Sequence, residues 1–288
     1  MAFVRDTTIG ALEIGVLVAT FLFGVTCAQV LRYFRDSTKD PRWVKILVAA
    51  VWFLDLSHAV ASCHYLYTTT ISQYGHPELL LVPPLSFDFI ILINGLIGAL
   101  EETWFIRRLY TFSKNVWISG LCGVLAFARF SFTMTITIIS FQLLPLPVFI
   151  ENWWWLTAGT VIIGAITDVS IVSSLCHYLW RWRRAECRRI TKLIDRVILC
   201  AIETSFFTSL VAVLLLVCFL TMPTNFIWIG IYMLLPRVFA NSLLFSLNFR
   251  ESLSQAFGAT LSNPEAGLTR RNSLYGIDSQ PVVMNDIW

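Results

Sequence analysis

Charged side chains are scarce in this sequence: only 14% of its 288 residues are Asp, Glu, Lys or Arg, whereas 57% are hydrophobic. With a mean hydropathy of +0.70, the chain is too apolar for a soluble domain of this length. We therefore predict a protein that crosses the lipid bilayer several times. Most of its basic residues lie between apolar runs, so we do not expect nucleic acid as a partner.

The motifs of several membrane-protein functions are missing as well. The last apolar run has no lysine, which excludes a retinal Schiff base because that bond needs a lysine amine. The third run is followed by Arg107-Arg108-Leu109-Tyr110, without the Asp/Glu-Arg-Tyr order of the largest class of G-protein-coupled receptors. The four histidines form neither an HExxH motif nor a multi-histidine box. We therefore predict no enzyme activity, no metal and no cofactor.

Seven apolar runs remain, each long enough to cross a hydrocarbon core, which takes about 20 helical residues. We predict an all-α fold: a membrane domain of seven transmembrane helices over residues 1–250, followed by a disordered cytoplasmic tail at 251–288. The predicted helices are residues 9–34, 43–68, 85–106, 116–144, 153–180, 194–221 and 225–249. Pro236 removes a backbone donor from the last helix, so we expect a kink there.

The basic residues indicate an orientation. Of the 21 Lys and Arg residues, all but Arg5, Arg129 and Arg237 lie in or beside the first, third and fifth connections or follow the last run. Lys and Arg in short loops stay on the cytoplasmic side. We therefore predict that the N-terminus is outside and the C-terminus is cytoplasmic, in a plasma membrane or an endomembrane.

Ionisable side chains inside the runs are the candidate functional residues, because a charge at the bilayer centre costs from about 2.5 kcal/mol upward. We predict an intramembrane polar network made of Asp55, His58, Arg129, Asp168, Glu203, Arg237 and Asn241. Arg237 is expected to be buried against Asp168 or Glu203, which lie at similar depth, with Asn241 on the same helix face. Asp55 or a bound anion is the next candidate partner. Such a network can hold helices together, line a ligand pocket or form a proton path.

Several segments of the C-terminal half resemble a known family. They are Leu193-Ile194-Asp195-Arg196, Ile202-Glu203-Thr204, Phe219-Leu220-Thr221-Met222-Pro223 and Asn241-Ser242-Leu243-Leu244. These segments are similar to seven-span membrane proteins of mushroom-forming fungi that carry a domain of unknown function, here at about residues 165–251. The resemblance implies a seven-helix fold and a membrane location, and it brings no assigned activity.

Span count and orientation favour a sensor or receptor-like protein, with the lipid bilayer and a small-molecule ligand or cytoplasmic effector as partners. A proton-coupled small-molecule transporter is the first alternative, although the odd span count and the lack of a repeat weaken it. A non-catalytic membrane scaffold is the second. A cavity open to the outside would favour a receptor, and its absence a scaffold. Ser273, two residues after an arginine pair, is a candidate phosphosite.

Overall fold

The computed structural model describes residues 6–37, 40–76, 79–142, 145–183, 188–223 and 225–261. This part of the chain is helical and contains no strand, and seven of its helices are long and apolar enough to cross a membrane. The α-helices are α1 (Ala11–Asp36), α2 (Arg42–Tyr67), α3 (Leu85–Ser113), α4 (Val116–Ser140), α5 (Leu146–Arg183), α6 (Arg188–Thr221), α7 (Ile227–Tyr232) and α8 (Leu235–Leu261). Short helical turns precede α1 (Asp6–Gly10), follow α2 (Thr68–Ser72) and precede α3 (Leu79–Leu81).

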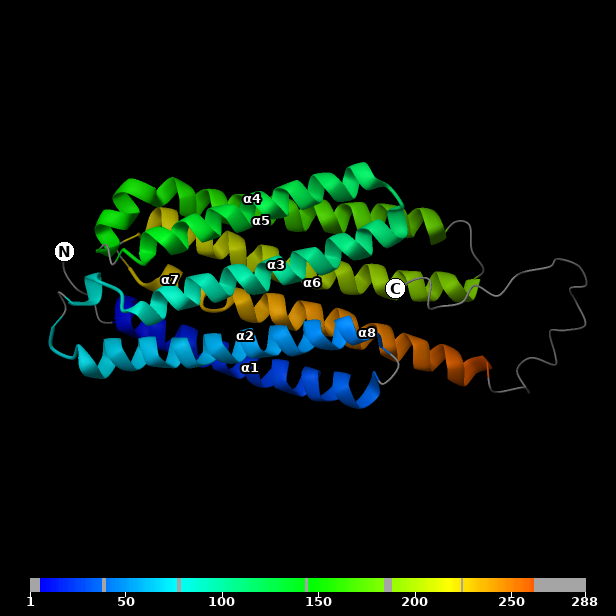
Figure 1. Ribbon diagram of the computed structural model, residues 1–288, viewed down its shortest axis with the longest axis horizontal. Helices are drawn as coiled ribbons and strands as arrows, with labels where there is room; N and C mark the ends of the chain where they lie inside the picture. The colour runs from blue at the N-terminus through cyan, green and yellow to red at the C-terminus, as the bar shows by residue number, and fades with distance from the viewer. Residues whose placement is uncertain are drawn as a thin grey trace, which may run out of the picture.

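The long helices form one elongated bundle (Figure 1). At one end, which we call the basic end, α1, α3 and α5 finish, α2, α4 and α6 begin, and α8 leaves the bundle. At the other end, which we call the proline end, the chain enters α1 and reverses after α2, α4 and α6. Pro83, Pro84, Pro145 and Pro223 lie in these reversals, where residues without a backbone donor are tolerated.

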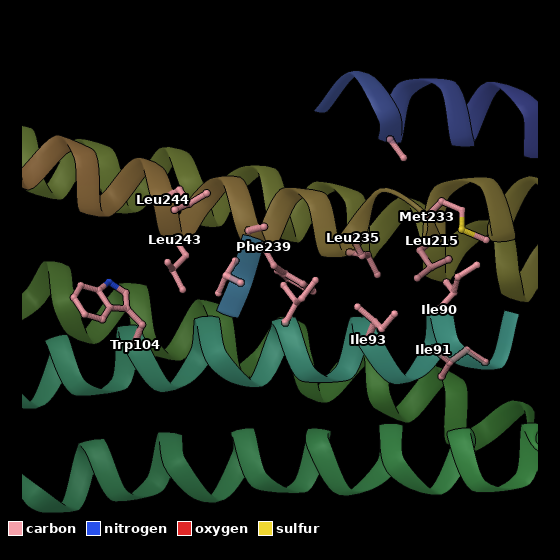
Figure 2. Close-up of a cluster of buried hydrophobic side chains, with 14 of the residues drawn as sticks. Ile90, Ile91, Ile93, Trp104, Leu215, Met233, Leu235, Phe239, Leu243 and Leu244 are labelled. Atoms are coloured by element: carbon pink, nitrogen blue, oxygen red, sulfur yellow. The ribbon is translucent and has the colours of Figure 1, made fainter. Parts of the chain in front are cut away.

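Two helices, α3 and α8, form the centre of the bundle. In the most apolar stretch of α3, 50% of the residues are buried, and in that of the span formed by α7 and α8, 67% are buried. In the other five membrane-spanning segments the buried share is 17–28%. α3 packs against α2, α4, α5 and α8, and α8 also packs against α1, α2 and α6. Figure 2 shows apolar side chains between these two helices, among them Ile90, Ile93, Leu235 and Phe239. The other helices expose large apolar side chains on their outer faces, as expected in contact with lipid.

The seventh span is broken where the kink was predicted. α7 ends at Tyr232, a turn follows at Met233 and Leu234, and α8 begins one residue before Pro236. Proline cannot donate to the carbonyl of the residue four positions earlier, here Tyr232, so the break coincides with the missing hydrogen bond. The kink prediction is therefore confirmed.

Helix ends differ from the prediction in several places because helices continue beyond their apolar runs. α3 extends to Ser113, and α5 begins at Leu146, directly before Pro147, a residue favoured in a first helical turn. α8 continues to Leu261 because the sequence after residue 249 contains no proline before that point. The predicted disordered tail therefore begins as helix, and its remainder, with Ser273, lies outside the described residues.

Two asparagines join α8 to α1. Asn241 donates from Nδ2 to the carbonyl oxygen of Leu22 at 3.2 Å, and Asn248 donates from Nδ2 to that of Gln29 at 2.9 Å. The donors are seven residues apart on α8, and the acceptors are seven residues apart on α1. α1 and α8 therefore run parallel and in register over at least two turns.

α1 also makes a close backbone contact with α7. A Cβ atom built on Gly15 would lie 2.5 Å from the Cα atom of Gly230, and one built on Gly230 would lie 2.6 Å from the carbonyl oxygen of Ala11. Next to this contact, the backbone N–H of Phe226 donates to the carbonyl of Thr7 at 3.1 Å. Only residues without a side chain allow the two helices to approach this closely.

Candidate functional site

Buried polar side chains form two clusters in the bundle. We call the first the Arg237 cluster; it consists of Arg237 on α8 with Asp55 and His58 on α2, all with at most 1% of their surface exposed. The guanidinium of Arg237 pairs with the carboxylate of Asp55 and also donates to the backbone carbonyl of Asp55 at 2.7 Å. Its second terminal nitrogen lies 3.1 Å from Nδ1 of His58, which therefore accepts. The cluster therefore joins α2 to α8 through buried polar contacts, as side chains between membrane helices often do.

The predicted partner of Arg237 is wrong. We expected Asp168 or Glu203 because both were placed at a similar depth, and the structure places Asp55 there instead. Depth alone does not say which helix faces Arg237, and this face of α8 packs against α1 and α2. Asn241 does lie beside the cluster, because its Nδ2 donates to the carbonyl of Arg237 at 2.8 Å.

The second cluster, which we call the Arg129 cluster, consists of Arg129 on α4, Glu101 and Glu102 on α3, and Asp168 on α5. Arg129 Nη1 donates to Glu102 Oε1 at 2.6 Å. Glycines on two neighbouring helices make room for this guanidinium: a Cβ atom on Gly98 or Gly164 would lie 3.3 Å or 2.9 Å from it. The ring of Phe239 covers the guanidinium, with 4.8 Å between Cζ and the ring centroid.

A cavity of about 100 Å³ lies against the Arg129 cluster. It reaches from Pro83 and Leu146 at the proline end to Glu102, Arg129 and Asp168 inside the bundle. Helices α3, α4, α5, α6, α7 and α8 all contribute to its wall. The wall is mainly apolar and aromatic, with Phe87, Phe130, Phe149, Trp228, Tyr232 and Phe239 among its side chains. An apolar cavity with a few convergent polar groups is the usual form of a small-molecule site.

A second polar position in the cavity wall lies nearer the proline end. The carboxylate of Asp88, of which 1% is exposed, accepts a hydrogen bond from the hydroxyl of Ser140, and its Oδ2 atom has no hydrogen-bond partner. The indole nitrogen of the buried Trp228, which also lines the cavity, has none either. Buried polar groups without partners cost free energy, so these two atoms indicate where a bound molecule or water would form hydrogen bonds.

The structure divides the predicted network. Asp55, His58, Arg237 and Asn241 belong to one cluster, and Arg129 and Asp168 belong to the other. Glu203 joins neither, because its side chain is exposed on the outer face of α6. The network prediction omitted Asp88, Glu101 and Glu102, although the sequence contains a signal for the last two. Paired glutamates inside an apolar run are rare enough to be candidate members of an intramembrane polar network.

Residues 164–252 match a family of unknown function (DUF6534). This agrees with the domain of unknown function predicted at about residues 165–251. No curated protein and no solved structure matches the chain.

The DUF6534 segment contains the C-terminal half of α5, all of α6 and α7, and the part of α8 that lies in the bundle. It supplies Asp168 and Arg237, whereas their cluster partners Glu102, Arg129, Asp55 and His58 all precede it in the chain. Both clusters, and the cavity, whose wall includes α3 and α4, therefore need the upstream helices. The matched segment by itself is not a complete site.

Proposed function

We propose that this chain is a sensor or receptor-like seven-helix membrane protein that binds a small organic molecule in the cavity above the Arg129 cluster. One observation carries the proposal: an apolar, aromatic cavity leads from one end of the bundle to a group of charged side chains inside it. A scaffold has no need for such a cavity, because filling it with side chains would stabilise the bundle. The wall suits a ligand with an apolar ring and a cationic or hydrogen-bond-donating group facing Asp88 or the cluster. We propose no enzyme activity.

We also propose the membrane orientation and the fungal origin that the sequence indicates. With the N-terminus outside, the cavity mouth faces the outside or the lumen, and the cytoplasmic end carries the basic connections, where an effector would bind. The resemblance to membrane proteins of mushroom-forming fungi supports a fungal origin for the chain.

Topology reporters test the orientation. We expect a fluorescent protein or enzyme reporter fused after Trp288 to be cytoplasmic, because nearly all basic residues lie at that end of the bundle. A glycosylation acceptor inserted beside Gly75, in the turn after α2, should be glycosylated in the lumen. Gly75 has a φ of +84° in an exposed turn and no atom within 4 Å of a built Cβ, so an insertion there leaves the bundle intact. Glycosylation of the C-terminal fusion instead would reverse the proposed orientation.

Thiol labelling from outside tests whether the cavity is a binding site open to water. Ala165 lines the cavity, whereas its neighbour Ile166 is 50% exposed on the outer face of α5. A membrane-impermeant quaternary ammonium methanethiosulfonate should modify Ala165→Cys in intact cells on the order of ten-fold faster than Ile166→Cys, because only thiolates in contact with water react. The modification is measured by mass spectrometry, with the parent chain as background.

Equal labelling of Ala165→Cys and Ile166→Cys would contradict a water-accessible cavity, since the two cysteines lie at the same depth.

The same pair of cysteine variants also distinguishes a receptor from a transporter. Glu102 and Asp168 also line a smaller cavity on the basic side of the cluster, which is the observation that favours transport. A transporter predicts that Ala165→Cys also reacts in inside-out vesicles, whereas a receptor predicts that it does not.

A further inference from the structure

The polar groups in the wall of the ligand cavity differ between its two ends. At the inner end the charged groups have partners within the protein. Arg129 is paired with Glu102, and the carboxyl group of Asp168 is hydrogen-bonded to the side chain of Thr208. These groups hold one another, so the polar part of a ligand is better matched nearer the proline end.

Three buried polar atoms of the cavity wall have no hydrogen-bond partner among the described residues. They are Oδ2 of Asp88 on α3, Oγ1 of Thr157 on α5 and Nε1 of Trp228 on α7. Trp228 lies one helical turn before Tyr232, whose hydroxyl is hydrogen-bonded to the side chain of Asn94, and Asp88 lies six residues before Asn94. Because α3 and α7 both run from the proline end, Asp88 and Trp228 lie at similar heights on the outer side of that contact.

Asp88 and Trp228 together select the polar group of a ligand. The indole N–H of Trp228 only donates, so it needs an acceptor, whereas an ionised Asp88 only accepts, so its Oδ2 atom needs a donor. An ammonium group offers no acceptor to Trp228. A carboxylate offers no donor to Asp88 and places a second negative charge beside it. A hydroxyl group both donates and accepts, and it also accepts a hydrogen bond from Asp88 in its neutral form.

The volume of the cavity limits the size of the ligand. It is about 100 Å³, whereas an apolar cavity of about 150 Å³ holds a benzene molecule. The apolar part of the ligand is therefore no larger than a single ring or a chain of about five carbon atoms. A long acyl chain does not fit.

We infer that the cavity binds a small neutral alcohol, whose hydroxyl donates to Asp88 and accepts from the indole N–H of Trp228. Its apolar part points inward, toward the ring of Phe239, which lines the cavity and covers Arg129. The hydroxyl of Thr157 discriminates least among ligands, because it both donates and accepts. This inference rests on the proposed function and adds the chemical class of the ligand.

Fluorine NMR tests the class of ligand on the full chain, purified in detergent micelles at pH 7. The probes are trifluoropropanol, trifluoropropylamine and trifluoropropanoate, which share one fluorinated group and differ in the polar end. Line broadening by the parent chain is compared with broadening by Ala165→Phe, which puts a phenyl ring into the cavity wall. The difference removes the contribution of probe dissolved in the micelle. Ile166→Phe, on the outer face of α5, is the matched control and should behave like the parent chain.

We expect the alcohol to bind the parent chain on the order of ten-fold more tightly than either charged probe, the usual effect of leaving one buried group unpaired. Trp228→Phe keeps an aromatic ring and removes the donor, so it should remove the preference for the alcohol over the amine. Asp88→Asn places a second donor beside the indole N–H, so it should shift the preference toward the carboxylate. A merely structural role of these two residues would weaken all three probes alike.

Tighter binding of the amine or the carboxylate to the parent chain would overturn the inference, while the cavity would remain a binding site. If no probe distinguishes the parent chain from Ala165→Phe, the proposed function fails together with the inference. Should Ala165→Phe not fold, an excess of unlabelled pentanol supplies the same background, because it empties a saturable cavity but not the micelle. Should Asp88→Asn not fold, Trp228→Phe alone decides, and an unchanged preference for the alcohol in that variant would overturn the inference.

Discussion

Replacing Arg237 with leucine should prevent most of the chain from accumulating as folded protein, and replacing Asp55 with asparagine in the same chain should restore part of it. The single substitution leaves the Asp55 carboxylate buried, with none of its surface exposed and its cationic partner gone. Removing one member of a buried ion pair typically costs about 3–5 kcal/mol. The second substitution removes the unpaired charge. Fluorescence-detected size-exclusion chromatography of a tagged chain measures the folded fraction, and thermal unfolding in detergent measures its stability.

Asp168→Asn provides the control for this rescue. It neutralises a carboxylate in the other cluster, so it should not improve Arg237→Leu and should add a defect of its own, because distant sites act independently. The pairing seen in the structure would be wrong if Asp168→Asn rescued the arginine variant and Asp55→Asn did not.

A second large effect is expected where α1 meets α7. Gly15→Leu should abolish folding, and Gly15→Ala should lower the free energy of unfolding by about 1–3 kcal/mol, the usual cost of overpacking. A new Cβ atom would lie 2.5 Å from a backbone atom of Gly230, and backbone cannot move aside as a flexible side chain can. The thermal unfolding midpoint of the detergent-solubilised protein measures the difference.

Gly24 is the matched position on the same helix. A Cβ atom on Gly24 would have no atom within 4 Å, so Gly24→Ala should raise the stability by about 0.5–1 kcal/mol through its better helix propensity. The two alanine substitutions are thus expected to act in opposite directions. Destabilisation of similar size at both positions would mean that α1 tolerates no change in general, and that the contact with Gly230 is not the cause.

The sequence predicts the depth of buried charges better than their partners. Hydrophobic length places Arg129 and Arg237 near the middle of their spans, and both are inside the bundle as expected. The partner of each charge depends on how its helix is rotated and on which helices pack beside it. Both properties follow from the packing of the whole bundle and cannot be read from one stretch of sequence. Arg237 therefore meets Asp55 on α2, and Arg129 meets Glu102 on α3.

The cavity is the part of the site that sequence reasoning could not supply. It is the space that six helices leave unfilled, and its wall depends on small residues such as Gly95 and Gly164 that are ordinary in membrane helices. Asp88 and Ser140 were missed for a related reason. Each lies near the end of a helix, where polar residues are common, and only the antiparallel packing of α3 on α4 brings them together.

The two asparagine contacts between α8 and α1 limit how the bundle can move. A slide of one helix along the other by part of a turn would break both hydrogen bonds at once, because the next carbonyl on the same face of α1 lies one turn, about 5.4 Å, further along. The hydrogen bonds of Asn241 and Asn248 therefore fix the height of α1 along α8, and the ion pair of Arg237 with Asp55 does the same for α2.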